Sequence, residues 1–80
     1  TDEAYERLVY GKAKHVSIGS LPGAKENVIT LQSISKTFAM AGFRMGYAIG
    51  PEKIISAMNL MKINTTLTPA TITQLTAAHA

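Results

Sequence analysis

The chain has 80 residues, 46% hydrophobic and 16% charged, with a formal net charge of +3. This length can bury one small core but is too short for an ordinary enzyme domain with a cofactor cleft, so we expect a piece of a larger protein that lacks an N-terminal part. Cysteine is absent, which excludes disulfides and thiolate metal sites, and the wide separation of His15 from His79 argues against a metal centre.

The distribution of charged and apolar residues limits the partners and the compartment. The lysines are scattered, with no basic stripe interleaved with aromatic residues, so we expect no nucleic acid partner. No apolar run approaches the length of a membrane span, and the first residues do not resemble a signal peptide. The sequence therefore predicts a protein that works in the cytoplasm and binds no membrane.

Two strands are predicted in the first two thirds of the chain. Residues 27–33 contain a β-branched apolar run that follows the turn-forming sequence LPGAKE, which is typical of a buried strand. Residues 43–50, FRMGYAIG, place apolar side chains at alternate positions and favour a second strand that ends before Pro51. The segment SISKTFAMAGFRMG, residues 33–46, connects the two strands.

Two helices are predicted after these strands. Pro51 can occupy the first turn of a helix, where its missing N–H costs nothing, and apolar residues then recur at helical spacing through residue 62. Thr68 can cap a further helix with Pro69 at its first position, which reaches the chain end. We find no internal repeat or linker, so no domain boundary is predicted within residues 1–80. Strands backed by helices indicate an α/β sheet.

The segment between the strands holds the residues best suited to chemistry. An amine is a useful nucleophile at neutral pH when desolvation or a neighbouring cation lowers its pKa, so Lys36 is a candidate nucleophile with Arg44 nearby in sequence. A guanidinium matches phosphate oxygens, and the hydroxyl groups of Ser33 and Ser35 can donate to the same oxygens. On residue types alone, a nucleophile beside a phosphate cup and a solvated lysine beside a surface arginine are equally good interpretations.

The same segment resembles the pyridoxal phosphate attachment signature of class I and II aminotransferases. The chain meets every fixed position of that signature, at Ser33, Ser35, Lys36, Gly42, Arg44 and Gly46. The two glycines permit a tight turn or a close approach of two backbones. Upstream, TDEAYERLVYG resembles the segment in which the family places an aspartate three residues before a tyrosine, here Asp2 and Tyr5. Downstream, GYAIGPEKIISAM and PATITQLTAAHA are similar to the family's strand and paired helices.

The resemblance covers essentially all 80 residues and implies both a fold and an activity. The chain would be a fragment of the large, cofactor-binding domain of a fold type I pyridoxal phosphate enzyme, with a mixed, mostly parallel sheet followed by two helices. The parent would be a homodimeric aminotransferase that transfers an amino group between an amino acid and a 2-oxo acid. The branch that it resembles most contains bacterial and archaeal aspartate and aromatic amino acid aminotransferases. The isolated 80 residues are expected to be inactive.

The resemblance also implies a role for each site residue. Lys36 would form the internal aldimine with pyridoxal phosphate and would later carry a proton between the substrate Cα and the cofactor. Asp2 would pair with the pyridine nitrogen, and Tyr5 would donate to the phenolic oxygen. The phosphate would be held by Ser33, Ser35 and Arg44. By residue type alone, Asp2 could also be a turn or cap acid, and Tyr5 a packed aromatic.

Two other functions stay open on the sequence alone. A lyase or synthase of the same superfamily, such as a carbon–sulfur lyase or a cyclopropane-forming synthase, would use the same lysine. Some of these lyases depart from the arginine or glycine pattern that is intact here, which favours transamination. A non-enzymatic module that kept the sheet and lost the chemistry is the alternative from a different class.

Overall fold

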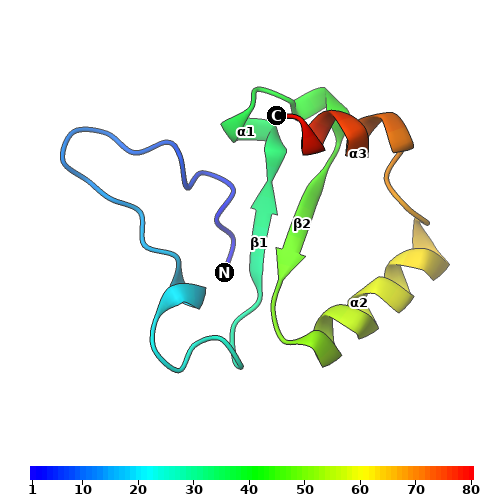
Figure 1. The fold of residues 1–80 in the computed structure, drawn as a ribbon, viewed down its shortest axis with the longest axis horizontal. Coiled ribbons are helices and arrows are strands. Elements are labelled where there is room, and N and C mark those ends of the chain that lie inside the picture. The colour runs from blue at the N-terminus through cyan, green and yellow to red at the C-terminus, as the bar shows by residue number, and fades with distance from the viewer.

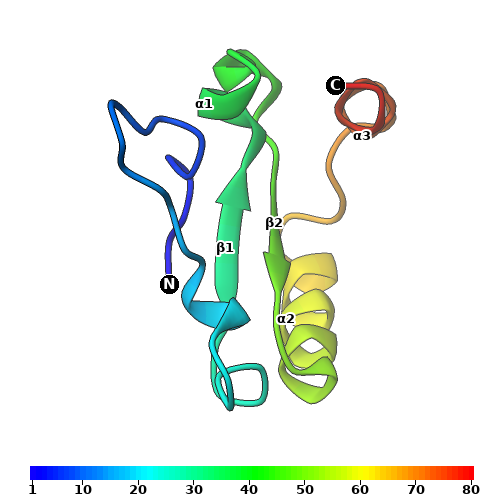
Figure 2. The same ribbon diagram turned by 60° about the vertical axis from the view of Figure 1, so that its left-hand side comes forward.

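The computed structural model describes all 80 residues, and its regular elements gather around one short pair of strands (Figure 1). In chain order they are η1 (Ile18–Ser20), β1 (Thr30–Ser33), α1 (Ile34–Thr37), η2 (Ala41–Phe43), β2 (Gly46–Ile49), α2 (Glu52–Thr65) and α3 (Thr71–Ala78). A long N-terminal loop lies beyond β1, whereas α2 and α3 lie beyond β2 (Figure 2). The predicted order of strands followed by two helices is confirmed.

The strands β1 and β2 pair antiparallel. The register runs from Thr30 opposite Ile49 to Ser33 opposite Gly46. A Cβ atom on Gly46 would lie 2.5 Å from the carbonyl oxygen of Gln32, so only glycine allows the strands to approach this closely. The close backbone approach expected of this glycine is confirmed.

A parallel bridge attaches the N-terminus to the other edge of β1. The N–H of Glu3 donates to the carbonyl oxygen of Leu31 at 2.9 Å, and the N–H of Leu31 donates to the carbonyl oxygen of Thr1 at 2.8 Å. The terminal ammonium of Thr1 donates to the carbonyl oxygen of Ile29 at 2.8 Å. This part of the sheet is therefore mixed, with one antiparallel pair and one parallel bridge, and the expectation of an α/β fold is confirmed.

Both strands are shorter than predicted. The range 27–33 is wrong at its start because residues 22–27 form turns, and because Pro51 has no N–H with which to extend the pairing. The range 43–50 is wrong at its start because η2 occupies that part of the connection. Arg44 then adopts a left-handed backbone conformation, with φ of 53°, which interrupts the extended chain.

The helix α2 is longer than predicted. It begins at Glu52, with Pro51 as its N-cap residue, and continues to Thr65 instead of ending at Lys62. The N–H of Thr66 donates to the carbonyl oxygen of Lys62 at 2.9 Å and closes the last turn.

No helix in the structure combines the length and the apolar character that a membrane span needs.

The predicted start of α3 is wrong. The helix begins at Thr71 with Ala70 as its N-cap residue, so Thr68 does not cap it and Pro69 is not its first position. The N–H of Gln74 donates to the carbonyl oxygen of Ala70 at 3.1 Å, so the first turn of the helix starts after Thr68 and Pro69. The Gln74 side chain donates to the carbonyl oxygen of Pro69 at 2.8 Å and so ties the helix to this extended segment.

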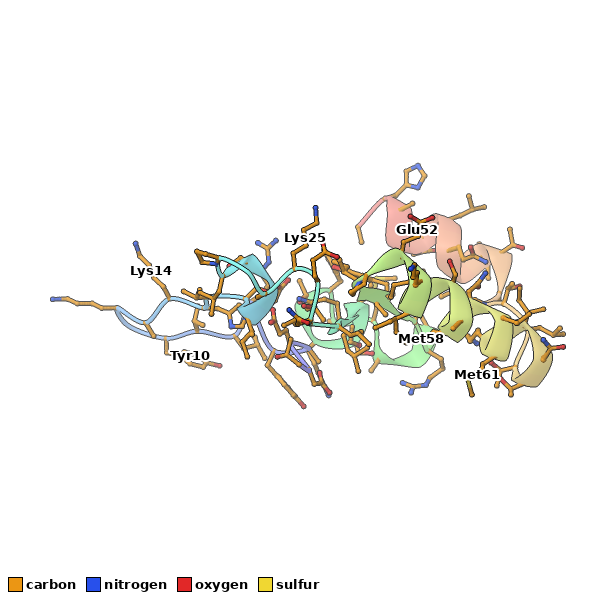
Figure 3. All side chains as sticks on the ribbon, turned by 90° about the horizontal axis from the view of Figure 1, so that it is seen from below. Tyr10, Lys14, Lys25, Glu52, Met58 and Met61 are labelled. Atoms are coloured by element: carbon orange, nitrogen blue, oxygen red, sulfur yellow. The ribbon has the colours of Figure 1, made fainter.

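Very little of the chain is buried. Ile34 is the one buried hydrophobic residue, with 4% of its surface exposed, and the other buried residues are Glu3, Thr30 and Thr73. Large apolar side chains lie exposed on the loop, on both strands and on both long helices. Figure 3 shows Tyr10 projecting from the loop at one end of the molecule and Met61 projecting from α2 at the other. The 80 residues form a framework that has almost no core of its own.

We expect the chain expressed by itself to show no cooperative thermal unfolding as a monomer, because burial of apolar surface is the main stabilising term in folding. Circular dichroism melts and sedimentation velocity measure this directly. Ile34→Ala is a matched probe, since in a cooperative core it costs about 2–5 kcal/mol. A sharp monomeric transition that Ile34→Ala lowers by that amount would contradict the expectation.

Candidate functional site

The end of β1 leads directly into the one-turn helix α1, which carries Lys36. Ser33 is both the last strand residue and the N-cap of α1, and its Oγ accepts a hydrogen bond from the backbone N–H of Ser35 at 3.2 Å. Buried Ile34 anchors the helix beneath this cap. As a result, two hydroxyl groups and one amine follow one another at the end of the strand.

The Lys36 amine has no competing partner and lies over an aromatic ring. Its Nζ is 5.8 Å from the centroid of the Tyr5 ring, within the range of a cation–π contact. It takes part in none of the side-chain hydrogen bonds of the chain, and the two ion pairs join Glu6 to Arg7 and Glu3 to His15. The structure therefore brings together Tyr5 and Lys36, which the sequence places far apart, and leaves the amine free.

Asp2 reaches the same region through its parallel bridge with Leu31. Its Oδ1 accepts a hydrogen bond from the backbone N–H of Ala4 at 3.1 Å, so the carboxylate does serve as a turn acid. Its Oδ2 has no hydrogen-bond partner in the chain. Asp2 thus keeps one acceptor for another group while the turn fixes the carboxylate.

Arg44 lies on the opposite edge of β1. The N–H of Ile34 donates to the carbonyl oxygen of Met45 at 3.3 Å, which brings the residue before β2 to the end of β1. The Arg44 Nη1 donates to the carbonyl oxygen of Ala41 at 2.9 Å, and the side chain is otherwise exposed. No direct hydrogen bond links Arg44 to the two serine hydroxyls. At Gly42 an added Cβ would meet no atom within 4 Å, so these residues give no steric reason for glycine there.

The chain has two cavities, and neither encloses the predicted site. One, of about 390 Å³, lies against the sheet and the N-terminal loop, and its lining includes Glu3, Glu6 and Lys25. The other, of about 500 Å³, lies between the sheet and α2, with Ile55 and Met58 in its lining. None of the six predicted site residues lines either cavity. These 80 residues therefore form no enclosed cavity around the predicted site residues.

Sequence reasoning missed the most highly connected polar residue of the chain, Glu3. Only 5% of its surface is exposed. Its Oε1 accepts hydrogen bonds from the Ser17 hydroxyl at 3.0 Å and from the Ile18 N–H at 3.2 Å, and its Oε2 lies 3.0 Å from Nε2 of His15. No periodicity or spacing announces this network, because its partners come from an irregular loop.

The hydrogen bond with His15 holds the pKa of Glu3 below its ordinary value of 4.5, and the bonds from Ser17 and Ile18 act in the same direction. Burial acts in the opposite direction, because it favours the neutral acid.

Acidic and histidine ligand atoms of Glu3, Glu6 and His15 lie within 4.8 Å of one another. Both carboxylate oxygens of Glu3 are already occupied by donors, so the cluster is a hydrogen-bond network.

In a folded protein that contains this chain, we expect Glu3 to stabilise the fold above the ordinary glutamate pKa and to lose this effect as the pH falls below about 4.5. The reason is the sign of the shift: an unfolded chain takes up the proton before the folded one does. Urea unfolding of wild type and Glu3→Gln at about pH 7 and about pH 4 tests this. The difference in unfolding free energy between wild type and Glu3→Gln should shrink at the lower pH. The corresponding difference for Glu6→Gln should change little between the two pH values. A Glu3→Gln difference that is equal at both pH values would contradict the expectation.

Comparison with known proteins places the whole chain within one family. The family model described as aminotransferase class I and II matches residues 1–80. Aspartate aminotransferase of Geobacillus stearothermophilus is 44% identical over 81 residues, which is all of this chain and 21% of that protein. Human kynurenine–oxoglutarate transaminase 3 is 41% identical over 80 residues, again all of this chain but 18% of that protein.

A solved structure agrees with these sequences. The crystal structure of the aromatic aminotransferase from Pyrococcus horikoshii OT3 superposes with a TM-score of 0.93 at 42% identity, and the match covers 98% of this chain and 21% of that one. The chain therefore spans about a fifth of the length of the relatives that it matches.

Proposed function

This chain belongs to the aminotransferase class I and II family, and we propose that its residues 1–80 form part of the large, cofactor-binding domain of a pyridoxal phosphate-dependent aminotransferase. The parent transfers an amino group between an amino acid and a 2-oxo acid. One observation carries the proposal: the Lys36 amine is unpaired, lies over the Tyr5 ring, and stands directly after the end of β1.

The donor set of the chain suits pyridoxal phosphate. The cofactor has an aldehyde, a ring nitrogen, a phenolic oxygen and a phosphate, and each has a chemical counterpart here. The counterparts are a free amine, a carboxylate with one unused oxygen, a phenol, two hydroxyls and a guanidinium, from Lys36, Asp2, Tyr5, Ser33, Ser35 and Arg44. When bound, this cofactor acts as an electron sink for the negative charge that develops at the substrate Cα.

Each of these side chains has a separate task in the proposal. Lys36 would hold the cofactor through its Nζ and, once a substrate amine displaces it, would act as a general base that carries the proton from the substrate Cα to the cofactor. The unused Oδ2 of Asp2 would accept a hydrogen bond from the ring N–H, and the hydroxyl of Tyr5 would donate to the phenolic oxygen. The phosphate is bound by Ser33, Ser35 and Arg44, which fix its position without taking part in proton transfer.

The proposal covers amino acid substrates as a class. The relatives described above are named for aspartate, kynurenine and aromatic amino acids, although they match this chain about equally well. All three are named as aminotransferases or transaminases, so a lyase, a synthase or a non-enzymatic module is not favoured. We further propose that the parent is a homodimer in the cytoplasm. We also propose that the isolated 80-residue chain has no activity, because Lys36 is exposed and neither cavity surrounds it.

In the parent protein, borohydride reduction in the presence of pyridoxal phosphate should place the pyridoxyl group on Lys36, and peptide mass mapping identifies the labelled lysine. Lys36→Ala should abolish turnover while some cofactor stays bound, since other residues hold the phosphate. Lys25→Ala, at a second exposed lysine, is the control and should be labelled at Lys36 as in wild type. A label on any other lysine of the chain would remove Lys36 from its proposed role.

Arg44→Lys should weaken pyridoxal phosphate binding, because a point charge replaces a planar fork that can form two parallel hydrogen bonds. The expected loss is about 1–3 kcal/mol, the scale of a charge-assisted hydrogen bond, which is roughly a 5- to 150-fold rise in Kd. The matched control is Arg7→Lys, the same change at the other arginine of the chain, which pairs with Glu6. Fluorescence titration measures both, and equal affinities would exclude Arg44 from the phosphate site.

A further inference from the structure

Glu3 is the only buried ionisable residue of the chain, and the proposed mechanism does not use it. We infer, on the basis of the proposed function, that Glu3 is a positioning residue: its carboxylate fixes the N-terminal segment that presents Asp2 and Tyr5 to the pyridoxal phosphate site. Glu3 touches neither substrate nor cofactor in this role. It acts through Asp2, which precedes it, and through Tyr5, which follows it by two residues.

The carboxylate joins two segments that no regular element connects. Oε1 accepts from the Ser17 hydroxyl and the Ile18 N–H, while Oε2 is bonded to His15, so both oxygens are satisfied by residues from the far end of the loop. Between these ends the chain is loosely held, and Tyr10 at 81% exposure marks its outer part. A buried charge is costly unless it is hydrogen-bonded, so the Glu3 carboxylate is stable in this place only while its partners His15, Ser17 and Ile18 are present.

The backbone of Glu3 is fixed at the same time. Its N–H donates to the carbonyl oxygen of Leu31 at 2.9 Å, and its own carbonyl oxygen accepts the N–H of Glu6 at 3.0 Å. The second bond closes a turn that contains Tyr5. Asp2 precedes Glu3 in the extended bridge with β1, so their side chains leave opposite faces of that segment. Holding the Glu3 side chain on one face therefore sets the direction of Asp2 on the other.

This connection affects only part of the site. The serine hydroxyls, Lys36 and Arg44 are positioned by β1, α1 and η2, and the Glu3 side chain makes no hydrogen bond to these elements. Loss of the carboxylate should leave the residues that bind the cofactor phosphate in place. It should loosen Asp2 and Tyr5, which are proposed to contact the cofactor ring. The expected signature is a modest fall in cofactor affinity together with a changed pH response of the bound cofactor.

The charged groups around Glu3 are His15, which bonds to it, and Glu6 and Lys25, which line the adjoining cavity. Glu6 provides the matched control. Its carboxylate lies within 4.8 Å of the same cluster but is bonded to Gln32 instead of the loop, with Gln32 Nε2 donating at 2.8 Å. Removing the Glu6 charge takes the same formal charge from the cluster and leaves the link between the segments intact.

The test uses the full-length parent, pyridoxal phosphate as the probe, and the variants Glu3→Ala, Glu3→Gln, Glu6→Gln and Tyr5→Phe. For Glu3→Ala we expect roughly tenfold weaker cofactor binding, the scale of a lost buried hydrogen-bond partner. At saturating cofactor, the pH midpoint of the visible absorption change should move in the same direction as it does in Tyr5→Phe. Glu3→Gln keeps an acceptor oxygen for Ser17, so its pH midpoint should move less than that of Glu3→Ala. The pH midpoint of Glu6→Gln should match that of wild type.

The outcomes separate the two levels of the proposal. A wild-type parent that takes up no pyridoxal phosphate overturns the proposed function. A wild type that binds cofactor, with Glu3 variants whose midpoint matches that of Glu6→Gln, overturns the positioning role alone. If Glu3→Ala does not fold, Glu3→Gln decides the same question, because a midpoint unchanged from wild type contradicts the inference and a shift toward that of Tyr5→Phe supports it.

Discussion

The hydrogen bonding of β1 along both of its edges determines where the proposed site residues lie. Leu31 directs its N–H and its carbonyl oxygen to residues 1–3, while β2 occupies the opposite edge in antiparallel register. One edge therefore brings the segment that carries Asp2 and Tyr5, and the other brings Arg44. The strand itself ends in Ser33, which caps the helix that carries Lys36. A four-residue strand thus gathers three distant parts of the sequence at one end.

This arrangement is held by polar contacts more than by apolar packing. Ile34 is the sole hydrophobic residue that is buried, and the charged residue Glu3 is buried almost as deeply. In an ordinary domain, a large apolar core would orient the loop, and a single hydrogen-bonded carboxylate would add little. Within these 80 residues, the hydrogen bonds of Glu3 with His15 and Ser17 join the two ends of the loop.

The sequence indicates candidate residues for the site but not the contacts between them. Lys36 and Arg44 stand at fixed spacing within a short segment, and such a pattern can be recognised without knowing any contact. The contact between Tyr5 and Lys36 depends on a bridge between residues far apart in the chain, which no local pattern encodes. The start of α3 was also predicted wrongly, because the chain from Leu67, with φ of 59°, to Ala70 stays outside the helix and its composition does not signal this.

Glu3 shows the same limit more strongly. An acid beside another acid in a polar N-terminal segment is normally a solvated residue, and composition supports that interpretation. Its burial follows from the return of the loop at residues 15–18, and irregular loops have no period from which such a return could be predicted. The six candidate site residues could therefore be proposed from the sequence, whereas the residue proposed to position two of them could not.

The left-handed backbone of Arg44 places conformational preference and side-chain chemistry in opposition at one position. Glycine, and to a lesser degree asparagine, adopt this conformation more easily than arginine does. Substitutions there that relax the backbone would favour the folded state while they remove the guanidinium. If Arg44 binds the phosphate as proposed, selection for thermal stability alone would favour glycine at position 44 and selection for cofactor retention would keep arginine, which is a trade-off between stability and activity.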